Sequence, residues 1–162
     1  MHLLWMLILM DETVCFQNGR ITRFDEVRQI NDQVSLKRGA IRLTLPADTV
    51  DWKRTEAANT GRLSEELGKI SRINPGRPTF EMSEVVISNI DVMNVPVVDL
   101  LLFLADIAQL NIYIDPSVSN QLKATYKLKN IPWRQAFELI LTNAGLDYDY
   151  SPGGYRLLGG LR

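Results

Sequence analysis

The most constraining feature of the sequence is a helical stripe near the C-terminus. Apolar residues recur there at the spacing i, i+3, i+4, i+7, i+8 and i+11, which is the pattern of a helix with one face in a core. The stripe consists of Trp133, Ala136, Phe137, Ile140, Leu141 and Ala144. Pro132 suits the first turn of this helix, where a missing N–H costs nothing, and Gly145 suits the left-handed position after its end. We therefore expect a core-facing helix from Pro132 to Gly145.

A second helix is expected from Pro96 to Leu110, and it is apolar on two sides. Its main face carries Val97, Leu100, Leu101, Leu104, Ile107 and Ala108. Leu102 and Phe103 add apolar bulk to the other side, next to Asp99, Asp106 and Gln109. A helix that is apolar on both sides is usually covered on both. Leu102 and Phe103 therefore either pack on a second sheet or form a surface for a partner, and both interpretations remain open.

Segments of strand character surround these two helices. Residues 84–95 precede the first helix, and the residues of Gln121–Lys129 alternate between apolar and lysine or threonine side chains. A closing hairpin is predicted from LDYDY and YRLL, which are separated by a Ser-Pro-Gly-Gly turn. The predicted order of elements in this part of the chain is β-α-β-β-α-β-β, and the predicted fold class is α+β.

This order and a series of matching residues closely resemble the "secretin and TonB N-terminus short" domain. The matching residues are Leu110-Asn111-Ile112, Asp115-Pro116-Ser117-Val118-Ser119, Leu128-Lys129-Asn130-Ile131-Pro132-Trp133, Gln135-Ala136, Leu139-Ile140-Leu141 and Gly145-Leu146. The resemblance implies two helices between two small sheets, which would explain a helix that is apolar on both sides. Asn120 stands where the family often has glycine, and asparagine tolerates the same turn.

The resemblance implies protein recognition as the function. In secretins the domain lies at the periplasmic end of an outer-membrane channel of type II secretion or type IV pilus machines, and in TonB-dependent transducers it signals to an anti-sigma regulator. We therefore expect a non-catalytic periplasmic or outer-membrane-associated adaptor whose partners are proteins of a cell-envelope secretion or pilus machine. The alternative is a signalling domain of the transducer type. Self-association of the chain is left open.

Strand addition at an exposed sheet edge is the expected physical basis of recognition, because backbone hydrogen bonds give affinity and alternate side chains give selectivity. Two segments are the candidate edges. They contain Val85, Val86, Ile87 and Ile90 in the first segment, and Tyr155, Leu157 and Leu158 in the second.

Residues 12–53 have a different pattern, in which short strand-like runs are separated by tight turns. Asn18-Gly19 between two such runs is a strong signal for a hairpin, because both central residues of a type I′ turn need positive φ. Ile41, Leu43 and Leu45 alternate with polar residues and predict a strand with one buried face. A small sheet of a few short antiparallel strands tends to curl and close, because its edges would otherwise stay unpaired. The pattern therefore resembles a small Sm-like β-barrel.

The net charge and the numbers of cysteine and histidine residues limit the classes of function that the chain can have. The net charge is −1, so the chain lacks the excess of lysine and arginine with which nucleic-acid binders neutralise phosphates. An RNA-binding barrel that uses Arg20, Arg23 and Arg42 is nevertheless kept as the competing hypothesis. The sequence has one cysteine and one histidine, which excludes metal sites built from such clusters. No catalytic, cofactor-binding or metal-binding residues are predicted, and the chain is not expected to be an enzyme.

The remaining segments are a leader and a connector. Residues 1–11 contain an apolar run too short to span a bilayer, and they are interpreted as a short export signal or, alternatively, as a first buried strand. Residues 54–83 predict a helix with Leu63, Leu67 and Ile70 on one stripe, followed by a Pro-Gly stop. The expected organisation is a leader at 1–11, a barrel-like domain at 12–53, a connector at 54–83 and the secretin-like domain at 84–162.

Overall fold

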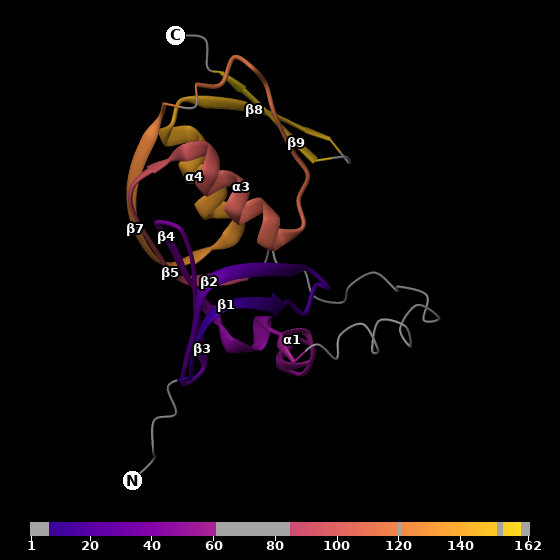
Figure 1. The fold of residues 1–162 in the computed structure, drawn as a ribbon. Helices are drawn as coiled ribbons and strands as arrows, with labels where there is room; N and C mark the ends of the chain where they lie inside the picture. The colour runs from indigo at the N-terminus through magenta and orange to yellow at the C-terminus, as the bar shows by residue number, and fades with distance from the viewer. Residues whose placement is uncertain (1–6, 61–84, 120, 152–153, 160–162) are drawn as a thin grey trace.

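The computed structural model describes residues 7–60, 85–119, 121–151 and 154–159 (Figure 1). In this part the protein is a mixed α+β fold with nine strands in two sheets and three α-helices. Within the same residues, no helix is long and apolar enough to cross a membrane. The larger sheet has the order β1-β2-β3-β4-β5-β7 and the smaller one the order β6-β9-β8.

The N-terminal half is an antiparallel meander of β1 (Leu7–Cys15), β2 (Ile21–Ile30), β3 (Gln33–Arg38) and β4 (Ile41–Pro46). A short 3₁₀ turn (Ala47–Thr49) and α1 (Trp52–Asn59) follow. Between them, Val50 forms an isolated antiparallel bridge with Phe16.

The predicted turns of this half are present, although one has a different geometry. Asn31 and Gly39 have the positive φ that tight hairpin turns need, at 53° and 60°. In the Asn18-Gly19 pair only Gly19 has positive φ, at 87°, so the type I′ assignment is wrong. The reason is that the Asn18 side chain is buried and donates a hydrogen bond to the carbonyl of Ile107 (3.0 Å), far along the chain.

The predicted barrel is wrong, because the meander does not close on itself. The outer side of β4 pairs with β5 (Val86–Pro96), which in turn pairs with β7 (Lys123–Pro132). The register aligns one apolar row across five strands, formed by Val27, Leu36, Leu43, Ile90 and Leu128. The next row, on the opposite face, is charged and consists of Glu26, Lys37, Arg42, Asp91 and Lys127. One sheet therefore runs through both halves of the sequence.

The C-terminal half has the order β5, α3 (Val97–Ala108), β6 (Ile112–Ile114), β7, α4 (Trp133–Asn143), β8 (Leu146–Ser151) and β9 (Gly154–Gly159). This is the β-α-β-β-α-β-β order predicted from the sequence. In Figure 1 the two helices lie inside the curve of β5 and β7, with β8 and β9 on their other side. Both helices begin directly after a proline, Pro96 or Pro132, which is the N-cap residue, so each starts one residue later than predicted.

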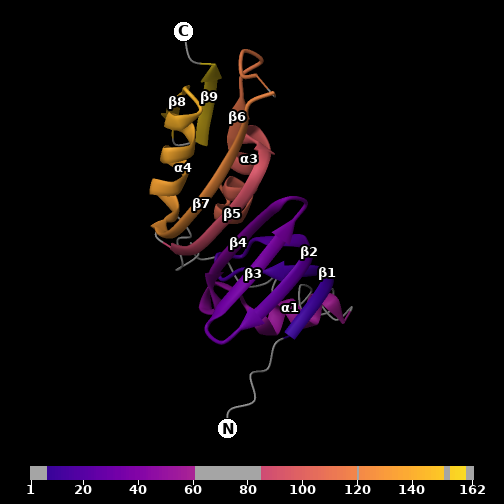
Figure 2. The same ribbon diagram turned by 90° about the vertical axis from the view of Figure 1, so that its left-hand side faces the viewer.

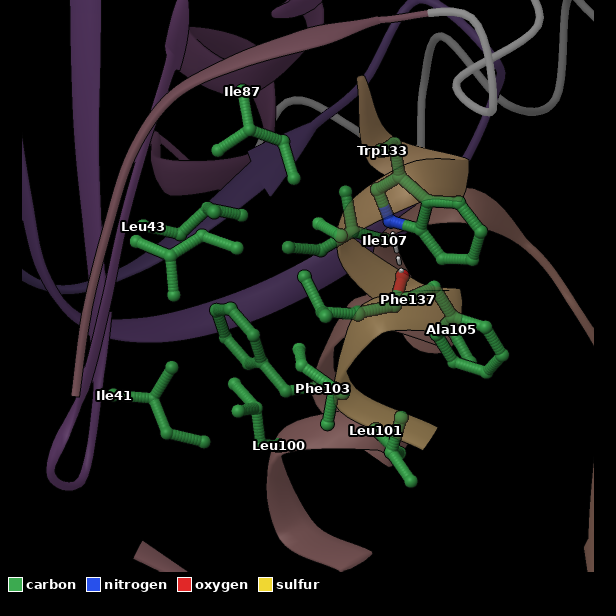
Figure 3. Close-up of a cluster of buried hydrophobic side chains, with 14 of the residues drawn as sticks. Ile41, Leu43, Ile87, Leu100, Leu101, Phe103, Ala105, Ile107, Trp133 and Phe137 are labelled. Atoms are coloured by element: carbon green, nitrogen blue, oxygen red, sulfur yellow. Dashed lines mark hydrogen bonds between the residues drawn. The ribbon is translucent and has the colours of Figure 1, made fainter. Parts of the chain in front are cut away.

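A single hydrophobic core joins the two halves. Ile41 and Leu43 of β4 and Ile87 of β5 point toward side chains of α3 and α4, among them Phe103 and Trp133 (Figure 3). The stripe predicted for α4 is buried at Trp133, Ala136, Phe137, Ile140 and Leu141. The indole of Trp133 stacks on Phe137 with ring centroids 4.9 Å apart, and its N–H donates to the carbonyl of Leu104 (3.0 Å). The two helices are thus fixed to each other by packing and by one buried hydrogen bond.

The proposed leader is partly a strand. Residues 7–10 pair with Glu26–Gln29 of β2 and are therefore part of a strand, whereas the export-signal interpretation stays a prediction. Residues 1–6 lie outside the described residues. The same is true of the helical stripe predicted at Leu63, Leu67 and Ile70, and of the Pro-Gly stop after it.

Candidate protein-interaction surfaces

Asp106 of α3 is the polar centre of the contact between the two halves. Its carboxylate forms salt bridges with Arg20 and with Arg38 (3.1 Å), and it accepts a hydrogen bond from the hydroxyl of Thr22 (2.8 Å). Charge-assisted hydrogen bonds of this kind are stronger than neutral ones. In the sequence, Asp106 stands beside the apolar residues on the second side of α3, and Arg20 is one of the arginines of the competing RNA-binding hypothesis. No local pattern could have indicated that the two residues meet.

Phe103 is also part of this contact, and it is not an exposed partner surface. Its ring packs edge-on against Phe24 with centroids 6.0 Å apart, and it is almost fully buried. The guanidinium of Arg38 lies 4.6 Å from the Phe103 ring centroid, a cation–π arrangement. Desolvation by burial lowers the pKa of Arg38, and the nearby Arg20 lowers it further. The sequence left two interpretations open for Leu102 and Phe103, which were packing against a sheet and a surface for a partner. For Phe103 the structure shows packing.

Leu102, unlike Phe103, is accessible to solvent, with 42% of the residue exposed. It lies on the wall of an open cleft of about 580 Å³ between the β3–β4 turn, the end of β5 and α3. The cleft is lined by Arg38, Gly39, Ala40, Ile41, Asn94, Val95, Pro96, Asp99, Leu102, Phe103 and Asp106. Its lining therefore combines apolar side chains with one cation and two carboxylates. Leu102 remains a candidate contact for a partner.

The two predicted sheet edges are not edges. Val86, Ile87 and Ile90 belong to β5, which lies between β4 and β7, and Val85 directly precedes that strand. Tyr155, Leu157 and Leu158 belong to β9, the middle strand of the smaller sheet. Of the seven residues, Val86 is the one with a largely exposed side chain, at 47%. The apolar character that suggested these segments reflects strands that are central in their sheets.

The outer strands of the larger sheet are β1 and β7, and the edge of β1 is covered by α1. The side-chain amide of Asn59 accepts from the backbone N–H of Thr13 and donates to its carbonyl, both at 2.9 Å. The hydroxyl of Thr55 accepts from the N–H of Cys15 (2.9 Å) and donates to its carbonyl (3.4 Å). Two residues one helical turn apart thus bind two residues of the strand edge as a neighbouring strand would. This arrangement protects the edge from pairing with another chain.

The edge of β7 is open in the described part of the chain, where β7 pairs with β5 alone. Lys123, Thr125, Lys127 and Lys129 of this strand are exposed, whereas Ala124, Tyr126 and Leu128 are partly buried against the core. In the smaller sheet the long outer strand is β8, and β6 spans three residues. The two long open edges of the described residues are therefore β7 and β8.

No group of three or more metal-binding side chains exists among the described residues. The one cysteine, Cys15, is fully buried in β1, and its pKa is raised by burial. No family model, curated protein or solved structure matches the chain in the comparisons.

Proposed function

We propose that the chain is a non-catalytic protein-interaction module, an adaptor of an outer-membrane secretin system that serves type II secretion or type IV pilus assembly. The observation that carries the proposal is the arrangement of residues 86–159, in which α3 and α4 lie between two sheets in the order β-α-β-β-α-β-β (Figure 1). The resemblance to the secretin and TonB N-terminus short domain implies two helices between two sheets, and this arrangement supports the proposal. The larger sheet has six strands here, because β1 to β4 continue it beyond β5. The position of α3 between two sheets accounts for its burial on more than one side.

The partner's place in this proposal is the cleft beside Leu102. Its lining offers apolar contact at Ala40, Pro96 and the exposed part of Leu102, and polar contact at Asp99. Protein interfaces typically surround a central apolar anchor with a polar rim. An apolar side chain of the partner would enter the cleft, and neighbouring polar groups would fix its orientation. The cleft lies where the two halves meet, so the N-terminal meander takes part in recognition.

The test is photo-cross-linking in cells. A photoreactive amino acid replaces Leu102 in the cleft, and a matched control replaces Val86, which is similarly exposed but lies at the other end of β5. We expect capture of a secretin or an inner-membrane assembly protein in the envelope fraction from position 102 and not from position 86. Capture of an anti-sigma regulator would instead support the transducer-type signalling function. Equal capture from both positions, or a cytoplasmic location of the protein, would contradict the proposal.

A substitution at the same position gives an independent measurement. Leu102→Lys places a charge in the cleft and should leave the fold intact, because Leu102 is already 42% exposed and a lysine there can direct its ammonium group into water. We expect the variant to keep its circular dichroism spectrum and thermal midpoint while its co-purification with the captured partner is lost. Salt-sensitive binding of RNA by the unmodified protein, lost on changing Arg20, Arg23 and Arg42, would favour the competing RNA-binding hypothesis.

A further inference from the structure

The backbone groups that β7 directs outward can be identified from the register. The N–H of Trp133 donates to the carbonyl of Val85, which makes these two residues a hydrogen-bonded pair at the end of the β5–β7 ladder. Antiparallel ladders alternate between hydrogen-bonded and non-hydrogen-bonded pairs. Counting back along the register, Lys127 and Lys129 bond to β5. Tyr126 and Leu128 therefore direct their N–H and C=O groups away from the sheet.

The same reasoning applies to β8. The N–H of Tyr155 donates to Asn111 and the carbonyl of Leu157 accepts from Asp115, so these residues of β9 bond toward β6. Arg156 and Leu158 must then bond to their partners in β8, which are Asp149 and Asp147. The intervening residues Tyr148 and Tyr150 direct their backbone groups outward. Within the described residues, each open edge thus presents two donor and acceptor sets that no strand pairs with, spaced two residues apart.

The exposed side chains of the two edges have opposite charges. Lys127 and Lys129 stand on β7, and Asp147 and Asp149 stand on β8, with all four side chains exposed. An antiparallel alignment that places Leu128 opposite Tyr148 joins the free backbone groups of the two edges. The same alignment places Lys127 opposite Asp149 and Lys129 opposite Asp147. Backbone pairing and charge pairing therefore agree in one register.

We propose that β7 of one copy of this chain pairs antiparallel with β8 of a second copy. Both strands pack on α4, and they lie on the α4 side of the molecule in Figure 2. A two-fold axis beside α4 would therefore let each copy supply one β7 and one β8, so that the contact forms twice. Such an isologous arrangement is the commonest form of homodimer. The inference does not rest on the secretin adaptor function, since it needs no other protein.

The first test is disulfide trapping between two single variants of the purified chain, Lys127→Cys and Asp149→Cys. These residues form a non-hydrogen-bonded pair in the proposed register, with Cα atoms about 4.5 Å apart, which suits a disulfide. We expect the mixed disulfide when the two variants are combined under mild oxidation. The control combines Lys127→Cys with Asp147→Cys, which the register separates. Trapping that is equal in both mixtures, or absent from the first, would overturn the proposed register.

Charge reversal gives the second test, with sedimentation equilibrium as the measurement. We expect the unmodified chain to dimerise in a salt-sensitive manner, and K127E/K129E and D147K/D149K each to weaken dimerisation about tenfold or more, because like charges then face each other. The two variants mixed together should dimerise as the unmodified chain does, since each interface then pairs opposite charges again. A chain that stays monomeric up to millimolar concentration would refute the proposal and show that the lysines of β7 block pairing. The cross-linking result at Leu102 is independent of either outcome.

Discussion

Removing the negative charge of Asp106 should loosen the contact between the two halves. In Asp106→Asn, at least one of the two arginines faces an amide group that donates rather than accepts, and the hydroxyl of Thr22 can lose its acceptor. A hydrogen bond to a charged group contributes about 1.5–3 kcal/mol, whereas a fully exposed ion pair contributes at most about 1 kcal/mol. The Asp106 side chain is 20% exposed, and the Arg20 and Arg38 side chains are 41% and 37% exposed. The contribution of each of these interactions to the free energy of unfolding therefore lies between these two limits. We expect a loss of about 2 kcal/mol in the free energy of unfolding.

The assay is urea unfolding followed by circular dichroism, supported by thermal unfolding, in which a loss of about 2 kcal/mol corresponds to about 4–8 °C. Asp99→Asn is the matched control, because Asp99 is an exposed carboxylate in the first turn of the same helix. Its loss removes a helix-dipole interaction of at most about 1 kcal/mol. A double-mutant cycle with Arg38→Met should show coupling between Arg38 and Asp106. If Asp106→Asn costs no more than Asp99→Asn, Asp106 does not hold the halves together and the reasoning is wrong.

Three further predictions concern single positions. Gly154→Ala should lower the thermal midpoint strongly, because the φ of Gly154 is +130° and a Cβ there would overlap the backbone carbonyl of Asn111. Gly39→Ala is the control, since its φ is +60° and no atom lies near the added Cβ, and it should lower the free energy of unfolding by only about 1 kcal/mol. Thr55→Val should destabilise by about 1–2 kcal/mol and speed hydrogen exchange at the Cys15 amide, and unchanged exchange would show that this edge is not covered by α1. Hydrogen bonds from the backbone N–H of Ser117 and from Arg156 lower the pKa of Asp115. The carboxylate therefore stabilises the fold above its unfolded pKa, and this contribution is lost as the pH falls through the folded pKa. Asp115→Asn should reduce the acid dependence of the free energy of unfolding, as measured by urea unfolding across that range.

The elements with a local signal were predictable from the sequence. The α4 stripe and the alternation of Ile41, Leu43 and Leu45 were both found with the predicted face buried. Each of these patterns depends on residues within a few positions of one another, because the helical and strand periods alone decide which face is apolar. For the same reason the order of elements after β5 and the local β8–β9 hairpin were predicted, whereas the pairing of β4 with β5 and of β5 with β7 was not.

The features that the sequence could not predict depend on contacts between residues far apart in the chain. Arg20 and Asp106 are 86 residues apart, and nothing in the neighbourhood of either indicates the other. The pairing of β4 with β5 crosses the predicted boundary between a barrel-like domain and a second domain. Strand composition also misplaced the edges, since Ile87 and Leu157 are apolar because their strands are central. The lysine-rich β7 has the composition of an edge strand, and that signal was available in the sequence.

The barrel prediction assumed that a small sheet must close because its edges cannot stay unpaired, and the structure satisfies this requirement differently at each edge. β5 continues the sheet beyond β4, and the side chains of α1 bind the edge of β1. These two solutions leave β7 and β8 as the long open edges of the described residues, one lysine-rich and one carrying aspartates. Lysine along both edges would repel every copy of the chain equally, whereas opposite charges on two edges repel like edges and attract unlike ones. The charge pattern therefore selects one pairing among those that the free backbone groups permit, and this selectivity is what the charge-reversal experiment measures.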